Sequence, residues 1–126
     1  LHHSYIWNNK GFQSFEDYLT VFNANQRRNI KRERKAVTNA GLIIKTLAAE
    51  EIPHHLFPLI YRFYSSTCDK FYWGSKYLTQ KFFEQLYPNY RQRVVLITAY
   101  QNEKDTKPVG LSSLLGKFSR VRLFTF

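Results

Sequence analysis

The sequence predicts a mixed α/β domain in which helices are layered on a sheet, and three observations support this. Four segments repeat at the three- and four-residue spacing of helices, and three shorter ones are rich in β-branched or aliphatic residues, as strands are. The last two strands are joined by a short polar stretch typical of a hairpin. The resulting order is helix, helix, strand, helix, helix, strand, strand, which favours the layered class.

The first two helices come early in the chain. Residues 15–23 carry an apolar stripe, and Ser14 and Asp17 have the spacing of an N-terminal cap pair. Residues 26–40 contain neither proline nor glycine, and Gly41 follows where a left-handed C-cap is expected. The apolar side of this second helix is narrow, so we expect it to lie on the surface.

The remaining elements are expected to form the sheet and the helices that cover it. The predicted strands are residues 42–47, 93–100 and 109–115, and the predicted helices are residues 54–68 and a helix that Thr79 caps and Pro88 ends. The second strand is almost continuously apolar, as expected for a strand covered on both faces. The pattern of residues 116–126 fits either a further strand or an irregular end.

The composition limits the function classes. A net charge of +10 favours anionic partners such as nucleic acid, polyphosphate or an acidic lipid surface. The single Cys68 excludes a disulfide within the chain and fits a reducing compartment, so we expect a cytoplasmic location. No stretch reaches the roughly 18 to 20 apolar residues that span a bilayer, so no transmembrane segment is expected.

Signatures of catalysis are scarce. The sequence contains no phosphate-binding glycine loop, no nucleophile elbow and no zinc-protease motif. The histidines form the adjacent pairs His2-His3 and His54-His55 rather than pairs spaced by four, and Cys68 has no histidine near it in sequence. We therefore expect no metal. The aromatic loop Tyr72-Trp73-Gly74, together with Tyr61, Tyr64 and Tyr77, either lines a pocket or belongs to the core.

A basic run is the strongest charge feature. Six of the nine residues 27–35 are cationic. Three interpretations remain open, namely a solvated helix face, a nucleic-acid-binding surface, and a site for an anionic ligand or lipid headgroup. The run contains no aromatic residue on which bases would stack, which counts against nucleic acid.

The chain resembles the FemAB-like family of predicted N-acyltransferases, and many short motifs in the family's order carry the resemblance. They are Trp7-Asn8-Asn9-Lys10-Gly11-Phe12, Ser14-Phe15-Glu16-Asp17-Tyr18-Leu19, residues 27–37, Ala40-Gly41, Phe63-Tyr64, Thr67, Asp69, Trp73-Gly74, Tyr77-Leu78-Thr79, Phe82-Phe83, Val94-Val95-Leu96 and Pro108-Val109-Gly110. Each motif alone is weak, so the specificity lies in the ensemble, which covers about residues 5–115.

The resemblance implies a fold and an activity. The family is similar to the GNAT acyltransferases and to the Fem-type aminoacyltransferases of peptidoglycan synthesis. It implies a GNAT-like fold, with a central mixed sheet and helices on its faces, and transfer of an acyl or aminoacyl group to an amine. The implied donor is acyl-CoA or aminoacyl-tRNA. The implied acceptor is an amino group on a small molecule, a peptide or a cell-wall precursor.

The sequence departs from the GNAT pattern at its C-terminus. GNAT enzymes hold the donor's pyrophosphate on a helix N-terminus that follows the fourth strand. Nothing after Leu115 supplies that strand, loop and helix. We therefore expect residues 1–126 to form a single, C-terminally incomplete domain that is a fragment of an acyltransferase and is inactive alone.

The resemblance also indicates candidate site residues. For the acceptor pocket we expect Tyr64, Asp69, Trp73 and Tyr77. Asp69 or a tyrosine hydroxyl is available for proton transfer, but no residue is identified as the catalytic base. The matched cations expected to contact an anionic substrate are Arg28, Lys31 and Arg32. The competing function is a nucleic-acid-binding module that uses the helix containing residues 27–35.

Overall fold

The structure of the protein is a computed structural model, which describes residues 5–71 and 76–116. The helices are α1 (Phe15–Leu19), α2 (Ala24–Asn39), α3 (Leu56–Asp69) and α4 (Gln80–Tyr90), and the strands are β1 (Ile43–Ala48), β2 (Val94–Tyr100) and β3 (Gly110–Leu115). Short 3-10 turns, Ala49–Glu51 and Arg91–Arg93, follow β1 and precede β2. This order confirms the predicted mixed α+β class.

The three strands form one antiparallel sheet in the order β1-β2-β3. Leu96 of the central strand lies opposite Leu47 on one side and Ser113 on the other. The pairing of β2 with β3 confirms the predicted hairpin. Both pairings in the described part are antiparallel, so the parallel pair that a mixed sheet requires is not among them.

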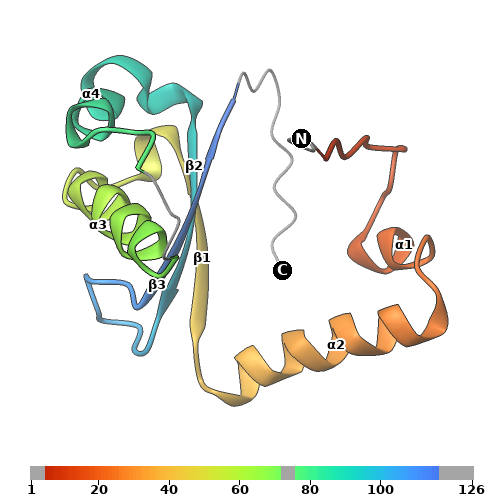
Figure 1. The fold of residues 1–126 in the computed structure, drawn as a ribbon. Helices are drawn as coiled ribbons and strands as arrows, with labels where there is room; N and C mark the ends of the chain where they lie inside the picture. Colours follow the sequence, from red (N-terminus) through yellow and green to blue (C-terminus); the bar gives the residue numbers. More distant parts are fainter. Residues whose placement is uncertain (1–4, 72–75, 117–126) are drawn as a thin grey trace.

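The core lies between the sheet and the two helices α3 and α4, which cover one of its faces (Figure 1). The buried side chains of this core are Ile52, Leu56, Phe57, Ile60, Phe83, Leu86, Val94 and Leu96. On the other face of the sheet, Val95 is only 2% exposed. Strand β2 is therefore buried on one face and partly buried on the other, where Ile97 and Ala99 are half-buried, so the predicted cover on both faces is confirmed in part.

Helices α1 and α2 lie on the opposite side of the sheet from α3 and α4 (Figure 1). Helix α2 carries no buried residue, which confirms its predicted surface position. The Ser14 hydroxyl accepts a hydrogen bond from the Asp17 N–H at 3.0 Å, as the cap spacing predicted. At the start of α2, Asn23 and Gln26 form a capping box that the sequence analysis missed.

The prediction that the first helix extends to residue 23 was wrong, because α1 ends at Leu19. Asn23 caps α2 and has the extended backbone that an N-cap needs, with φ −69° and ψ 169°. A helix cannot continue through a residue in that conformation. The Thr20 hydroxyl also donates to the Asp17 carbonyl at 2.7 Å, which closes the last turn of α1.

The prediction that Pro88 ends the fourth helix was also wrong, because α4 continues to Tyr90. Proline fixes φ at a helical value, and this one lies in the last turn, where it removes a single backbone hydrogen bond. The preceding Tyr87 packs against Phe57 with ring centroids 5.2 Å apart. This contact holds the last turn of α4 against the core.

Two residues with left-handed backbone mark the two ends of β1. Gly41 has φ 72° and ends α2, which confirms the predicted glycine C-cap. Ala49 has φ 49° immediately after β1 and is the one non-glycine residue with positive φ in the described ranges. Its carbonyl accepts a hydrogen bond from the Arg91 Nε at 3.1 Å, and the neighbouring Glu50 carbonyl accepts one from Nη2 of the same guanidinium at 3.0 Å.

We expect substitutions at these two residues to have opposite effects on the free energy of unfolding. Gly41→Ala should lower it by about 1 kcal/mol, because L-residues disfavour left-handed backbone and no atom lies within 4 Å to add a steric effect. Ala49→Gly should leave it unchanged or raise it by up to about 1 kcal/mol, because strain is relieved at some cost in backbone entropy. Urea denaturation of both variants measures this. Destabilisation of equal size in both would contradict the prediction.

Candidate functional site

Two of the predicted acceptor residues, Tyr64 and Tyr77, are joined by hydrogen bonds. Tyr64 lies on α3, and Tyr77 lies in the segment that leads to α4. The Tyr64 hydroxyl oxygen accepts hydrogen bonds from the backbone N–H of Tyr77 at 2.8 Å and of Leu78 at 3.0 Å. The contact therefore runs from one side chain to the other residue's backbone, and the Tyr77 side chain is 84% exposed. Trp73 lies outside the described residues.

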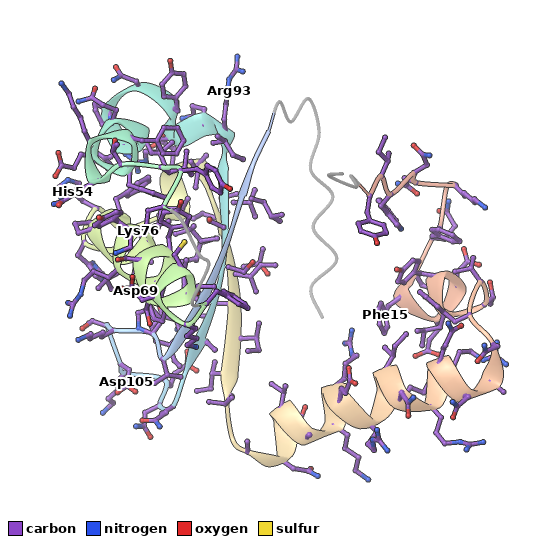
Figure 2. All side chains as sticks on the ribbon, viewed as in Figure 1. Phe15, His54, Asp69, Lys76, Arg93 and Asp105 are labelled. Carbon is purple, nitrogen blue, oxygen red and sulfur yellow. The ribbon has the colours of Figure 1, made fainter. Side chains whose placement is uncertain are left out.

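Asp69, the third predicted acceptor residue, pairs with a lysine that sequence reasoning missed. Its Oδ1 lies 3.0 Å from the Lys76 Nζ, and the side chains are 64% and 38% exposed. The two residues lie close together at one end of α3 (Figure 2). The hydrogen bond to the Asp69 carboxylate raises the pKa of Lys76 above its ordinary value. The sequence held no signal for this pair, because the chain must first fold back beside α3.

Beside Asp69 an open hollow of about 440 Å³ lies on the outer side of α3. Its lining is polar and carries both signs of charge, and consists of Tyr61, Arg62, Ser65, Ser66, Asp69 and Lys70. This hollow could have been predicted from helical spacing. Arg62, Ser66 and Asp69 recur at intervals of four and three residues, so they share one face of the helix. The hollow can therefore hold a ligand with charged or hydrogen-bonding groups.

Tyr64 lines a different depression from Asp69. This second cleft, of about 250 Å³, is mainly apolar and lies between α3, α4 and β3, where it is lined by Tyr64, Leu78, Phe82, Phe83, Leu86, Val94, Ser113, Leu114 and Leu115. The Tyr64 ring packs against Phe83 with centroids 5.3 Å apart, and Tyr61 packs against the same ring at 5.6 Å. Both tyrosine rings thus contribute to packing, which was one of the two interpretations of the aromatic residues.

The predicted cations and the predicted acceptor residues lie apart. Asp69 and Lys76 lie on the side of the sheet that carries α3, whereas Phe15 of α1, which α2 contacts, lies on the other side (Figure 2). Arg28, Lys31 and Arg32 all belong to α2. The structure therefore does not bring them into one site with Tyr64, Asp69 and Tyr77.

The cations of α2 divide into two groups. Three of them are engaged within the protein. Lys31 pairs with Glu16 of α1 at 3.1 Å, the Arg34 guanidinium lies 4.0 Å from the centroid of the Phe15 ring of α1, and Arg27 donates to the carbonyl of Phe22 in the turn between α1 and α2. The other three, Arg28, Arg32 and Lys35, are exposed and form no ion pair or hydrogen bond with the residues that the structure describes. Of the three predicted cations, Arg28 and Arg32 are thus available to a ligand, whereas Lys31 is engaged.

Among the described residues, His54, His55 and Cys68 form no centre of their own. His54 packs against Tyr87 with ring centroids 4.2 Å apart, and a ring nitrogen of His55 lies 2.9 Å from the Thr106 carbonyl oxygen. His2 and His3 lie outside the described residues. Within residues 5–71 and 76–116, no group of three histidine, cysteine or acidic residues is placed to hold a metal ion. No helix in those ranges is long and apolar enough to span a bilayer.

We expect Tyr64→Phe to loosen the start of the segment before α4. The variant keeps the ring but removes the oxygen that accepts from Tyr77 and Leu78, so both amides should exchange hydrogen with solvent faster. Tyr61→Phe is the matched control, because its ring packs on the same Phe83 and its hydroxyl makes no hydrogen bond with the described residues. Equal exchange rates in the two variants would show that the Tyr64 hydroxyl does not hold this segment.

We expect Arg34→Gln to weaken the contact between α1 and α2, while Arg28→Gln leaves it intact. A cation–π contact at an exposed site contributes about 0.5–1 kcal/mol. The amides of Thr20, Val21 and Phe22 donate hydrogen bonds to carbonyls of α1. They should therefore lose protection from hydrogen exchange only in the Arg34 variant. The two variants carry the same change of charge. Equal losses would mean that net charge, and not the Phe15 contact, sets the protection.

Comparison with known proteins identifies the family. Residues 1–120 match the FemAB-like family, which is described by peptidoglycan biosynthesis and recognition. Searches of curated proteins and of solved structures gave no significant match. The match includes all of the described elements, from α1 through β3. The chain therefore belongs to the FemAB-like family.

Proposed function

We propose that this protein takes part in the transfer of an acyl or aminoacyl group to an amine of a peptidoglycan precursor. The observation that carries the proposal is the family match over residues 1–120, because this family is tied to peptidoglycan biosynthesis and recognition. The polar hollow beside Asp69 supports it, because it offers charged and hydroxyl groups to an acceptor. The donor is acyl-CoA or aminoacyl-tRNA. With a single free Cys68, the protein suits a reducing compartment, and we propose the cytoplasm.

The proposed reaction forms an amide. The neutral amine nitrogen attacks the carbonyl carbon of the activated acyl group, and a C–N bond forms. The bond from that carbon to the thiol sulfur of CoA, or to the ribose oxygen of the tRNA, then breaks, and the leaving group takes up a proton. Because an amine is protonated near neutral pH, a nearby base must first accept a proton from the acceptor's ammonium.

Among the proposed acceptor residues, Asp69 is best placed to receive that proton. Its carboxylate is exposed in the hollow, and it already holds one ammonium, that of Lys76, at 3.0 Å. The Tyr64 oxygen instead accepts two backbone hydrogen bonds, so we assign it the positioning of the segment before α4. The exposed Tyr77 hydroxyl is the second candidate for proton transfer.

The cations of α2 are proposed to contact an anionic part of a substrate through Arg28 and Arg32. They lie across the sheet from Asp69, so this contact would serve a part of the substrate distant from the reacting amine. The competing function, nucleic-acid binding by residues 27–35 alone, gains no support. Three of the six cations in that run are engaged within the protein, two with α1 and one with the turn that follows it.

The test is an acyl-transfer assay with the protein encoded by the complete reading frame. Each donor class is incubated with a peptidoglycan-precursor peptide, and the acylated product is measured by mass. Asp69→Asn should lower kcat/KM by about 100-fold, the lower range for general base catalysis. Glu51→Gln is the control, because this exposed carboxylate lies outside the hollow. If neither donor gives a product, the proposed function is refuted. An unchanged kcat/KM in Asp69→Asn would refute the assignment of Asp69 as the base.

A further inference from the structure

The outer face of α3 places opposite charges along a single row. Arg62, Ser66 and Asp69 follow one another at intervals of four and three residues, and all three line the hollow of about 440 Å³. At 1.5 Å per residue, Arg62 and Asp69 are separated by about 10 Å along the helix axis. The hollow thus has a cation toward one end, a carboxylate toward the other, and a hydroxyl between them.

Asp69 already acts as an ammonium site. Its carboxylate oxygen lies 3.0 Å from the Lys76 Nζ, the distance of a charge-assisted hydrogen bond. The Asp69 side chain is 64% exposed and the Lys76 side chain 38%, so solvent screens the pair and it contributes little stability. Another ammonium can therefore replace that of Lys76 at little cost.

Arg62 is available for a carboxylate. Its side chain is exposed, lines the hollow, and forms no ion pair with the residues that the structure describes. The planar guanidinium presents paired N–H donors that match the two oxygens of a carboxylate. Lys70, which also lines the hollow, adds a second cation that forms no ion pair with the described residues. The free charge in the hollow is therefore positive, and the negative charge is committed to an ammonium.

We propose that this hollow binds a short zwitterionic peptide, with its ammonium on Asp69 and its carboxylate on Arg62. An extended peptide advances about 3.3–3.6 Å per residue, so three residues span the roughly 10 Å between Arg62 and Asp69 along the helix axis. A dipeptide is shorter, but the long, flexible Arg62 side chain can reach along the helix to meet its carboxylate. The Ser66 hydroxyl lies on the same row and is available to the peptide backbone. The inference rests on the proposed function in that it names the chemical class of the acceptor, a peptide that carries both a free amine and a free carboxylate.

The binding test uses three dipeptide probes in an NMR titration of the 126-residue chain. Glycylglycine carries both charges, glycylglycinamide lacks the carboxylate, and N-acetylglycylglycine lacks the ammonium. Glycylglycine should shift the amide signals of Ser65, Ser66 and Asp69 with a Kd of about 1 mM, the upper end of common KM values. Each modified probe should bind about two- to fivefold more weakly, because an exposed charge-assisted contact contributes up to about 1 kcal/mol. Equal shifts with all three probes, or none with glycylglycine at tenfold higher concentration, would overturn the proposal.

Variants show which residue binds which end of the peptide. Arg62→Gln should abolish the preference for glycylglycine over its amide but keep the preference over the acetylated probe. Asp69→Asn should abolish the preference over the acetylated probe but keep the preference over the amide. Lys76→Gln should tighten binding of glycylglycine, because it removes the ammonium that competes for Asp69. Any other pattern of preferences would show that the two ends of the peptide are not read by these residues.

Lys81→Gln and Glu51→Gln are the controls matched in charge. Both residues are exposed, lie outside the hollow and form no ion pair within the described ranges. Both variants should keep both preferences. A loss of preference in Lys81→Gln equal to that in Arg62→Gln would mean that net charge, and not the hollow, selects the carboxylate, and would overturn the proposal.

The titration separates failure of this inference from failure of the proposed function, because it needs no acyl donor. Selective binding of glycylglycine with no acyl transfer by the protein of the complete reading frame would leave the peptide site standing and refute the transferase. Acyl transfer that proceeds equally well with the free and the amidated acceptor, together with equal binding of the three probes, would refute the zwitterion site alone.

Discussion

The rest of the structure depends on the burial of β2. This strand is hydrogen-bonded on both edges. One face is buried throughout, with Leu96 fully buried, and on the other face Val95 is only 2% exposed while Ile97 and Ala99 are half-buried. Buried apolar strands fix their register, because a slip of one residue would exchange the two faces. The register of β2 in turn determines where α3 and α4 dock. The outward face of α3, with its row of charges, is therefore positioned by a strand that contributes no residue to the hollow.

The cations of the basic run, residues 27–35, fall into two groups with different surroundings, although they lie close together in the sequence. Lys31 and Arg34 hold α1 against α2, whereas Arg28 and Arg32 face solvent. The separation follows from helical geometry, because residues three and four apart share a face and neighbouring residues do not. Counting cations thus overestimates how many are available to a ligand. The free cations lie across the sheet from Asp69, so one uniform basic site does not describe the molecule.

Much of the fold could be predicted from the sequence, because single residues mark where several of its elements begin and end. Gly41 ended α2 and Thr79 capped α4 as predicted, and both effects depend on the chemistry of a single residue. The two errors had different causes. The end of α1 was misplaced because the local capping box of Asn23 and Gln26 was missed, whereas at Pro88 the packing of Tyr87 keeps the last turn helical. The site was harder to predict. Periodicity could have grouped Arg62 with Asp69, but the approach of Lys76 depends on how the chain returns beside α3, which no local pattern encodes.

The hydrogen bonds that Arg91 donates near Ala49 affect how the hollow on α3 can vary in its side chains. Arg91 bonds to the carbonyls of Ala49 and Glu50, so the chain that leaves β1 is fastened to the chain that enters β2. The two ends of the intervening segment, which contains α3 and α4, are thus held together at the sheet. The inward side chains of both helices form the core, so the outward-facing side chains of α3 can change with little effect on the strands beneath. Other side chains at these outward positions would give a different hollow on the same three-stranded base.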